Sequence, residues 1–312
     1  MAIVLLVGGY CLLALPALAR RLGRHLDPAE WARLCAGLLA GGAAVVESAL
    51  LLMALPLVAR AAGFPELAHV CERMLGMMAP ASWPVGWAAA LGAVGLPLFA
   101  ARGVGRAWRT QQRFRIEPEL GEHRPYGSHE LVVLPTDALI ALSVGGRPGQ
   151  IVVSQGLIDT LSDDELAAVV RHEAAHLEHD HHRFLLLAAA VDAALLPLPL
   201  ARRSVVAFRT ALERWADEVA AGGHEGGRTT VRSALVGVAL AVVSPAVAAF
   251  TGVDDVVERL DALQAPTPSP SALRRAAIYT PVVAVSVMVL VALGAWIGHA
   301  HAMLAVGGPC PT

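Results

Sequence analysis

The chain has 312 residues, of which 56% are hydrophobic and only 16% are charged. A soluble domain usually carries about a quarter charged residues, and a mean hydropathy of +0.58 with long apolar runs indicates a membrane protein. The formal net charge of −2 excludes whole-chain electrostatic attraction to nucleic acid, because phosphate binding needs a clustered basic surface. Disorder, a coiled coil and a disulfide scaffold are excluded as well.

Four apolar segments are long enough to cross a bilayer, which takes about 20 residues. Two further runs are ambiguous, because 185–200 is short and contains prolines, and 231–250 has the pattern of a buried soluble helix as much as of a span. The four predicted spans are 2–19, 35–58, 84–101 and 279–300.

Arginines near the span ends predict the orientation of the chain. Loops rich in Lys and Arg stay in the cytoplasm, and three arginine clusters agree on one side if the N-terminus lies outside. The sequence therefore predicts a multi-pass protein of the cytoplasmic (inner) membrane, with both termini outside. Its expected parts are three spans in 1–101, a cytoplasmic domain in 102–275, and a last span with a short outer tail in 276–312. The three clusters are Arg20, Arg21, Arg24 and Arg33; Arg102, Arg106, Arg109, Arg113 and Arg115; and Arg274 and Arg275.

The predicted cytoplasmic domain, 102–275, begins with segments typical of β-strands and continues with a helix. Short β-branched runs at 129–134, 139–144 and 150–153 predict strands. Ser162 with Glu165 three residues later forms a capping box, which predicts that a helix starts there.

That helix carries the sequence His172-Glu173-Ala174-Ala175-His176. Two histidines four residues apart lie on one helix face, so both imidazoles can bind one Zn²⁺, and Glu173 beside the first can act on a water molecule. The alternative is a pair of surface histidines without a metal.

A catalytic zinc site needs a third protein ligand and an open position. Glu213 and Asp217 lie four residues apart in a later helical segment. Glu213 is the candidate ligand, and Asp217 can accept the second ring N–H of a ligating histidine, His172 first among them. An ordinary solvated helix face is the alternative for this pair. The donor that stabilises the oxyanion stays open among three unranked candidates, His224, Arg214 and His181.

The two motifs, HEAAH and ERWAD, resemble the gluzincin membrane peptidases, specifically the M56 family of β-lactam sensor-transducers; the M48 family is a close relative with a similar second motif. The resemblance implies a mainly α membrane protein, with about four transmembrane helices and an inserted gluzincin-like α+β zinc metallopeptidase domain. It implies zinc ligation by His172, His176 and Glu213, catalysis by Glu173 as base, and a supporting role for Asp217.

The leading functional hypothesis is an integral-membrane zinc endopeptidase that cleaves a cytosolic or membrane-proximal protein, which the M56 resemblance implies to be a transcriptional repressor. About a dozen residues follow the last predicted span, without a penicillin-binding domain or an S-x-x-K motif, so no covalent β-lactam binding is expected. The alternatives are an M48-like quality-control membrane protease and a non-catalytic membrane signalling scaffold with a structural zinc site. A site-2 type intramembrane protease is disfavoured, because the HEAAH helix is too polar.

Two smaller predictions follow from topology. If Glu213 shares a metal with the histidines, the chain between them must begin and end on the same side of the membrane. The run 185–200 should therefore form a re-entrant or membrane-apposed helical hairpin, bent at Pro197 and Pro199. Cys71 and Cys310 both fall on the predicted outer side, so they either form a disulfide or remain two free thiols.

Overall fold

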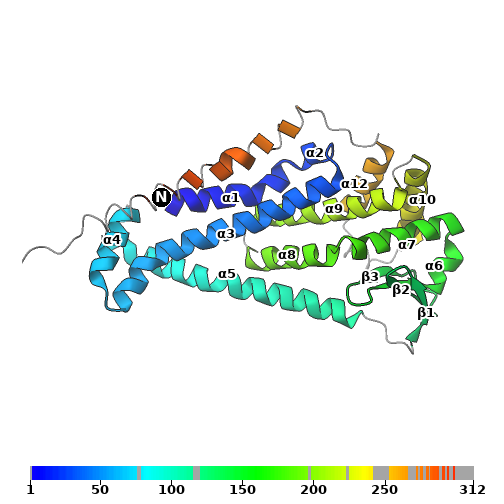
Figure 1. The fold of residues 1–312 in the computed structure, drawn as a ribbon, viewed down its shortest axis with the longest axis horizontal. Coiled ribbons are helices and arrows are strands. Elements are labelled where there is room, and N and C mark those ends of the chain that lie inside the picture. Colours follow the sequence, from blue (N-terminus) through cyan, green and yellow to red (C-terminus); the bar gives the residue numbers. More distant parts are fainter. Residues whose placement is uncertain are drawn as a thin grey trace, which may run out of the picture.

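The structure is a computed structural model that describes residues 2–75, 79–114, 120–195, 198–222, 225–241 and 253–265, and scattered residues between 272 and 298. Within these residues the protein is mainly helical. Long helices run side by side, and a small mixed sheet lies at one end of them (Figure 1).

Three helices form the N-terminal part of the bundle: α1 (Ala2–Leu18), α3 (Pro28–Ala61) and α5 (Ala79–Arg113). The short helices α2 (Arg20–Gly23) and α4 (Pro65–Leu75) connect them. In the described part of the chain, α3 and the Trp83–Arg113 part of α5 are long and apolar enough to cross a membrane, whereas α1 is a shorter apolar helix. Two of the four predicted spans thus have matching candidate helices, at 35–58 and 84–101. The fourth, 279–300, is described only in part, and its described residues are helical.

Small residues let these helices approach closely. Gly9 of α1 and Gly42 of α3 face each other, and a Cβ on Gly42 would lie 2.9 Å from the Gly9 carbonyl oxygen. A Cβ on Gly103 of α5 would clash with the carbonyl oxygen of Ala189 in α8. Close backbone approach at glycine is typical of helix contacts in membranes.

A helical hairpin, α8 (His181–Ala194) and α9 (Pro199–Ala221), packs against the N-terminal helices. One apolar core joins α1, α3, α8 and α9 and includes Leu13, Trp31, Phe208 and Leu212. The chain reverses between 194 and 199, within the run predicted to form a hairpin. The contact of this hairpin with a bilayer stays a prediction.

The sheet has the strand order β1-β2-β4-β3. Strand β2 (His129–Leu134) pairs in parallel with β4 (Gln150–Ser154), while β1 (Glu122–Tyr126) and β3 (Ala141–Val144) pair antiparallel at the two edges. Valine and isoleucine side chains make β4 buried throughout. Strand β1 is not predicted from the sequence, because its polar residues and Pro125 lack a β-branched pattern. An edge strand tolerates both features.

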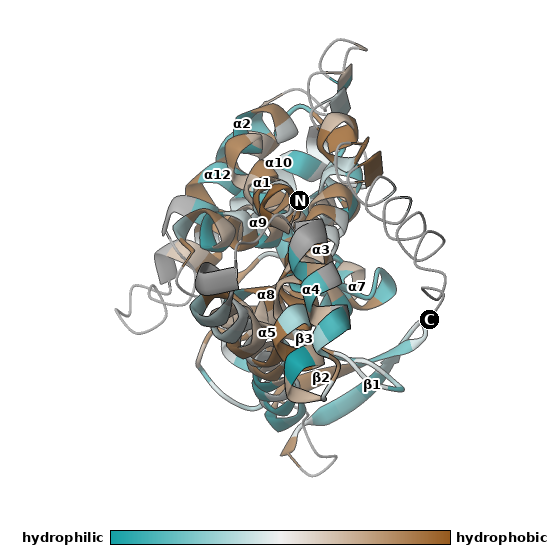
Figure 2. Cartoon of the chain, turned by 90° about the vertical axis from the view of Figure 1, so that its left-hand side faces the viewer, coloured by the Kyte–Doolittle hydropathy of each residue, from teal (hydrophilic) through white to brown (hydrophobic). Residues whose placement is uncertain are grey.

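The remaining helices surround the sheet and the end of the bundle. They are α6 (Gln155–Thr160), α7 (Asp163–Glu178), α10 (Glu225–Ala241) and α12 (Val253–Gln264). Helix α7 packs on the sheet through Val170 and Ala174. Hydrophobic residues are concentrated on helices such as α5, whereas β1 is mostly hydrophilic (Figure 2).

Candidate metal centre

Helix α7 starts where the sequence predicts it. The Ser162 side chain accepts from the Glu165 N–H, and the Glu165 carboxylate accepts from the Ser162 N–H, so the capping box is confirmed. The helix then continues without interruption to Glu178, which places His172 and His176 one turn apart on the same face.

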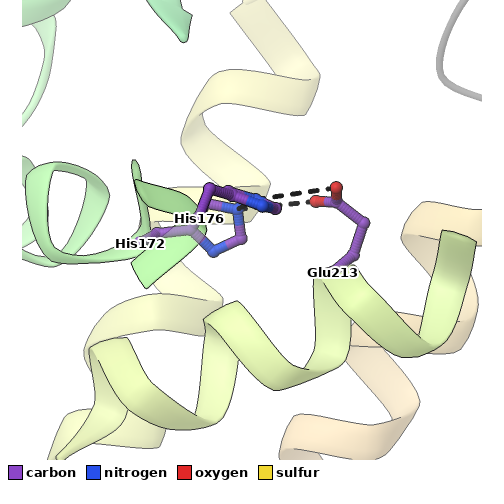
Figure 3. Close-up of side chains that lie close together, drawn as sticks. All are labelled: His172, His176 and Glu213. Atoms are coloured by element: carbon purple, nitrogen blue, oxygen red, sulfur yellow. Dashed lines mark hydrogen bonds and ion pairs between the residues drawn. The ribbon is translucent and has the colours of Figure 1, made fainter. Parts of the chain in front are cut away.

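Glu213 reaches both histidines from α9 (Figure 3). The Nε2 atoms of His172 and His176 lie 3.2 Å apart. The Glu213 carboxylate is 3.4 Å from Nε2 of His172 and 3.7 Å from Nε2 of His176. Three possible ligand atoms therefore lie within 4.8 Å of one another.

These separations fit a tetrahedral Zn²⁺. Bonds of about 2.0–2.1 Å to nitrogen and oxygen place neighbouring donor atoms about 3.3 Å apart. Two ring nitrogens and a carboxylate directed at one point repel each other when all three present lone pairs, and a cation between them removes that repulsion. The donor set therefore suits a metal with three protein ligands.

The outer ring nitrogen of each histidine has a partner. Nδ1 of His172 lies 3.0 Å from Oδ1 of Asp217, which is one turn beyond Glu213 on α9. Nδ1 of His176 lies 2.8 Å from Nδ1 of His181, the first residue of α8. Such contacts orient ligating imidazoles and fix their tautomer.

Arg259 on α12 is a site residue that the sequence did not reveal. It donates from Nε and Nη2 to the two carboxylate oxygens of Asp217, at 2.8 and 2.7 Å. Its Nη1 lies 3.2 Å from Glu213. No periodicity or local motif links position 259 to 213 and 217, so only the packing of α12 on α9 brings them together.

The electrostatics of the site favour a positive charge among the donors. Burial opposes a charged imidazole, but hydrogen bonds to Asp217 and Glu213 outweigh it and raise the pKa of His172 to about 10. Burial would raise the pKa of Glu213, yet His176, Arg259 and His172 hold that pKa well below its usual range. Burial lowers the pKa of His176. A proton on His172 competes with a metal for the same nitrogen.

Glu173 lies beside the donors and lines a cavity of about 520 Å³. One side of the cavity is polar and contains His172, Glu173, Glu213, Asp217 and Arg259. The other walls are mainly apolar and include Leu139, Ala141, Val231, Leu235, Val238 and Val257. Edge strand β3 thus borders the cavity, next to the metal donors.

The three candidate oxyanion donors and the two predicted disulfide cysteines do not line the cavity in the described part of the chain. The Arg214 guanidinium donates to the Arg24 carbonyl, 3.1 Å away, and is therefore directed toward the α2 end rather than toward the cavity. His181 contacts Nδ1 of His176, whereas Glu213 lies near Nε2 of the same ring. His224 and Cys310 lie outside the described residues. Cys71 is buried in α4 and has no disulfide partner among the described residues. Because Cys310 is not among them, the pairing of the two cysteines stays a prediction.

The chain matches a protein family model, and the match includes the candidate metal site. No curated protein and no solved structure matches the chain significantly. Residues 122–265 match the family model described as Peptidase family M48. The matched segment contains the sheet, the three metal-donor residues, Asp217 and Arg259. The more specific resemblance to the M56 sensor-transducers is not confirmed. The match supports an M48-related zinc metallopeptidase domain in residues 122–265.

Proposed function

We propose that this protein is an integral-membrane, zinc-dependent endopeptidase that hydrolyses peptide bonds of a cytosolic or membrane-proximal protein. The observation that carries this proposal is the convergence of His172, His176 and Glu213 on one point beside the Glu173 carboxylate. A structural zinc is usually held by four ligands, often cysteines. Among the described residues only three donors converge here, and a cavity opens beside them.

The chain's own residues account for the proton transfers of peptide hydrolysis. His172, His176 and Glu213 would hold the Zn²⁺, which would supply Lewis acidity and lower the pKa of water at the site. The Glu173 carboxylate accepts a proton from the attacking water and returns it to the leaving amine. Asp217 accepts the Nδ1–H of His172 and keeps its Nε2 free for the metal.

The substrate backbone is proposed to pair with β3 as an added strand. Ile140 bonds to β4 in both directions: its N–H donates to Ser154 Oγ at 2.9 Å, and its carbonyl accepts from the Ser154 N–H at 3.0 Å. Because successive residues of a strand alternate, the Ala141 N–H and carbonyl point to the open edge. Main-chain pairing there would bind peptides largely independently of their side chains.

A membrane location is supported by α3 and α5. Residues 79–101 of α5 contain no charge, and at about 1.5 Å per residue they extend about 34 Å, enough for the hydrocarbon core. Trp87, Leu91 and Leu98 are exposed on this helix, as lipid-facing side chains are. The proposed topology is multi-pass, in the inner membrane, with the active site on the cytoplasmic side.

Two biological roles fit this proposed activity, and they differ in the protein that is cleaved. Cleavage of a cytosolic transcriptional repressor in a signalling pathway is what the M56 resemblance implies. The family match over 122–265 favours the second version, an M48-like quality-control protease.

The test is the Glu173→Gln variant, purified in detergent and incubated with unfolded β-casein and Zn²⁺. Zinc content should stay unchanged, and cleavage should fall by about 10²–10⁴-fold because the general base is lost. Glu178→Gln, an exposed position on the same helix, is the matched control and should cleave normally. Undiminished cleavage by Glu173→Gln overturns the proposal. A wild type that binds zinc without cleaving any protein would indicate a signalling scaffold instead.

The same variant identifies the substrate. When Glu173→Gln is expressed in membranes, its natural substrate should remain uncut and bound to it. Recovery of a DNA-binding repressor would favour signalling, and recovery of damaged membrane proteins would favour quality control.

A further inference from the structure

His181 is a buried histidine in contact with a metal-donor residue. Its side chain is 0% exposed, and its Nδ1 lies 2.8 Å from Nδ1 of His176. Asp180, just before it, has a positive φ of 55°. This left-handed residue separates α7 from α8, so His181 begins a new helix and its ring lies against His176 of the helix just ended.

The two Nδ1 atoms are close enough for a hydrogen bond, which needs one donor and one acceptor. One nitrogen must donate a proton and the other must accept it, because two lone pairs repel at this distance. If His181 donated, a neutral His176 would carry its proton on Nε2, the atom that lies 3.2 Å from His172 Nε2. That proton would block metal binding. If His176 donates, its Nε2 presents a lone pair to the metal.

The surroundings of His181 favour an uncharged ring that accepts. The ring centroid lies 4.7 Å from that of Trp215 and 6.4 Å from that of Phe184. Burial among aromatic rings disfavours an imidazolium. Nε2 of His181 has no hydrogen-bond partner among the described residues. A buried polar atom without a partner costs stability, so packing alone does not explain a histidine here.

We propose that His181 is a positioning residue: it accepts the Nδ1–H of His176 and thereby holds His176 in the tautomer whose Nε2 binds zinc. This inference rests on the proposed function. Asp217 has the corresponding relation to His172, at 3.0 Å. The two candidate histidine ligands thus differ. His172 donates to the charged carboxylate of Asp217, whereas His176 donates to the neutral ring of His181.

The test compares His181→Leu with His181→Asn in the full-length protein in detergent. The two side chains have nearly the same shape, but only Asn has an oxygen close to the position of the lost Nδ1 that can accept the His176 proton. Zinc affinity is measured by competition with a chromophoric chelator, and the Co²⁺-substituted protein gives a visible absorption spectrum of the site. His181→Leu should weaken zinc binding about 10–100-fold and change the Co²⁺ spectrum. His181→Asn should restore most of the affinity and the wild-type spectrum.

His179→Asn is the matched control. His179 stacks on Trp215 with a centroid distance of 4.8 Å and is not among the metal donors, so its zinc affinity should stay at the wild-type value. Thermal unfolding of the metal-free variants shows whether each one folds. Wild-type affinity in His181→Leu overturns the inference, and so does an equal loss in folded His181→Leu and His181→Asn. If the wild type binds zinc but does not cleave proteins, the proposed function fails while the zinc measurements still decide the role of His181.

Discussion

Arg259 and Asp217 form a bidentate ion pair between α12 and α9, with both donor–acceptor distances below 3 Å. Both side chains are largely buried, and Arg259 also lies 3.2 Å from Glu213. One guanidinium therefore balances two carboxylates, one a candidate metal ligand and the other the partner of His172. This makes α12 a structural part of the candidate metal centre.

Replacing Arg259 should destabilise the metal-free protein more than the zinc-bound protein. Arg259→Met leaves the buried Asp217 carboxylate and the half-buried Glu213 carboxylate without their cation, and breaking a buried pair costs about 3–5 kcal/mol. Bound Zn²⁺ supplies positive charge at the same place and should reduce that cost. Arg259→Lys keeps the charge but loses the bidentate geometry. The stability of this variant should therefore lie between that of Arg259→Met and that of the wild type. Thermal unfolding with and without chelator measures both effects; equal destabilisation in the two states would mean that Arg259 does not balance the charge of the metal donors.

Removal of the metal should lower the unfolding temperature of the wild type. A ligand that binds only the folded state adds about 4 kcal/mol of stability at a concentration 1,000 times its Kd. A strong chelator should remove this contribution, and added Zn²⁺ should restore it. Glu213→Gln lacks a carboxylate donor, so its unfolding temperature should respond much less to the chelator. A chelator response in Glu213→Gln as large as that of the wild type would argue against Glu213 as a ligand.

Ala141→Pro should weaken substrate binding without unfolding the sheet. Proline removes the N–H that points to the open edge of β3, and it is tolerated there because that N–H does not pair with β4. One lost hydrogen bond is worth about 0.5–1.5 kcal/mol, so KM for a peptide substrate should rise about 2–10-fold with little change in kcat. Thermal unfolding of the variant serves as the control. An unchanged KM would mean that the substrate does not pair with Ala141.

Gly103→Ala should disturb the contact between α5 and α8, whereas Gly105→Ala should not. A Cβ at Gly103 would clash with a backbone oxygen of α8, but a Cβ at Gly105 would meet nothing within 4 Å. Alanine at 105 should even stabilise the helix by up to about 1 kcal/mol. Unfolding temperatures of the two variants in the same detergent test this difference. If Gly103→Ala were as stable as Gly105→Ala, α5 and α8 would not be packed as closely as the structure has them.

Local sequence determined the start of α7, the position of His172 and His176 on one helix face, and the three strands β2, β3 and β4. Each of these depends on residues only a few positions apart, through capping and periodicity, so neighbouring residues suffice to specify them. The same is true of the apolar length of α3 and α5. The sequence also placed Glu213 and Asp217 on one helix face, although it could not show which way that face points.

Tertiary structure alone decided which distant residues meet. The convergence of α9 on α7 brings Glu213 to the two histidines, the packing of α12 brings Arg259 to Asp217, and the turn at Asp180 brings His181 behind His176. Strand β1 belongs to the same group, because its backbone pairing with β2 rather than its own residue pattern makes it a strand. Contacts between residues far apart in the chain leave no local periodicity, so the sequence determined the candidate metal donors, and only the fold decided what surrounds and orients them.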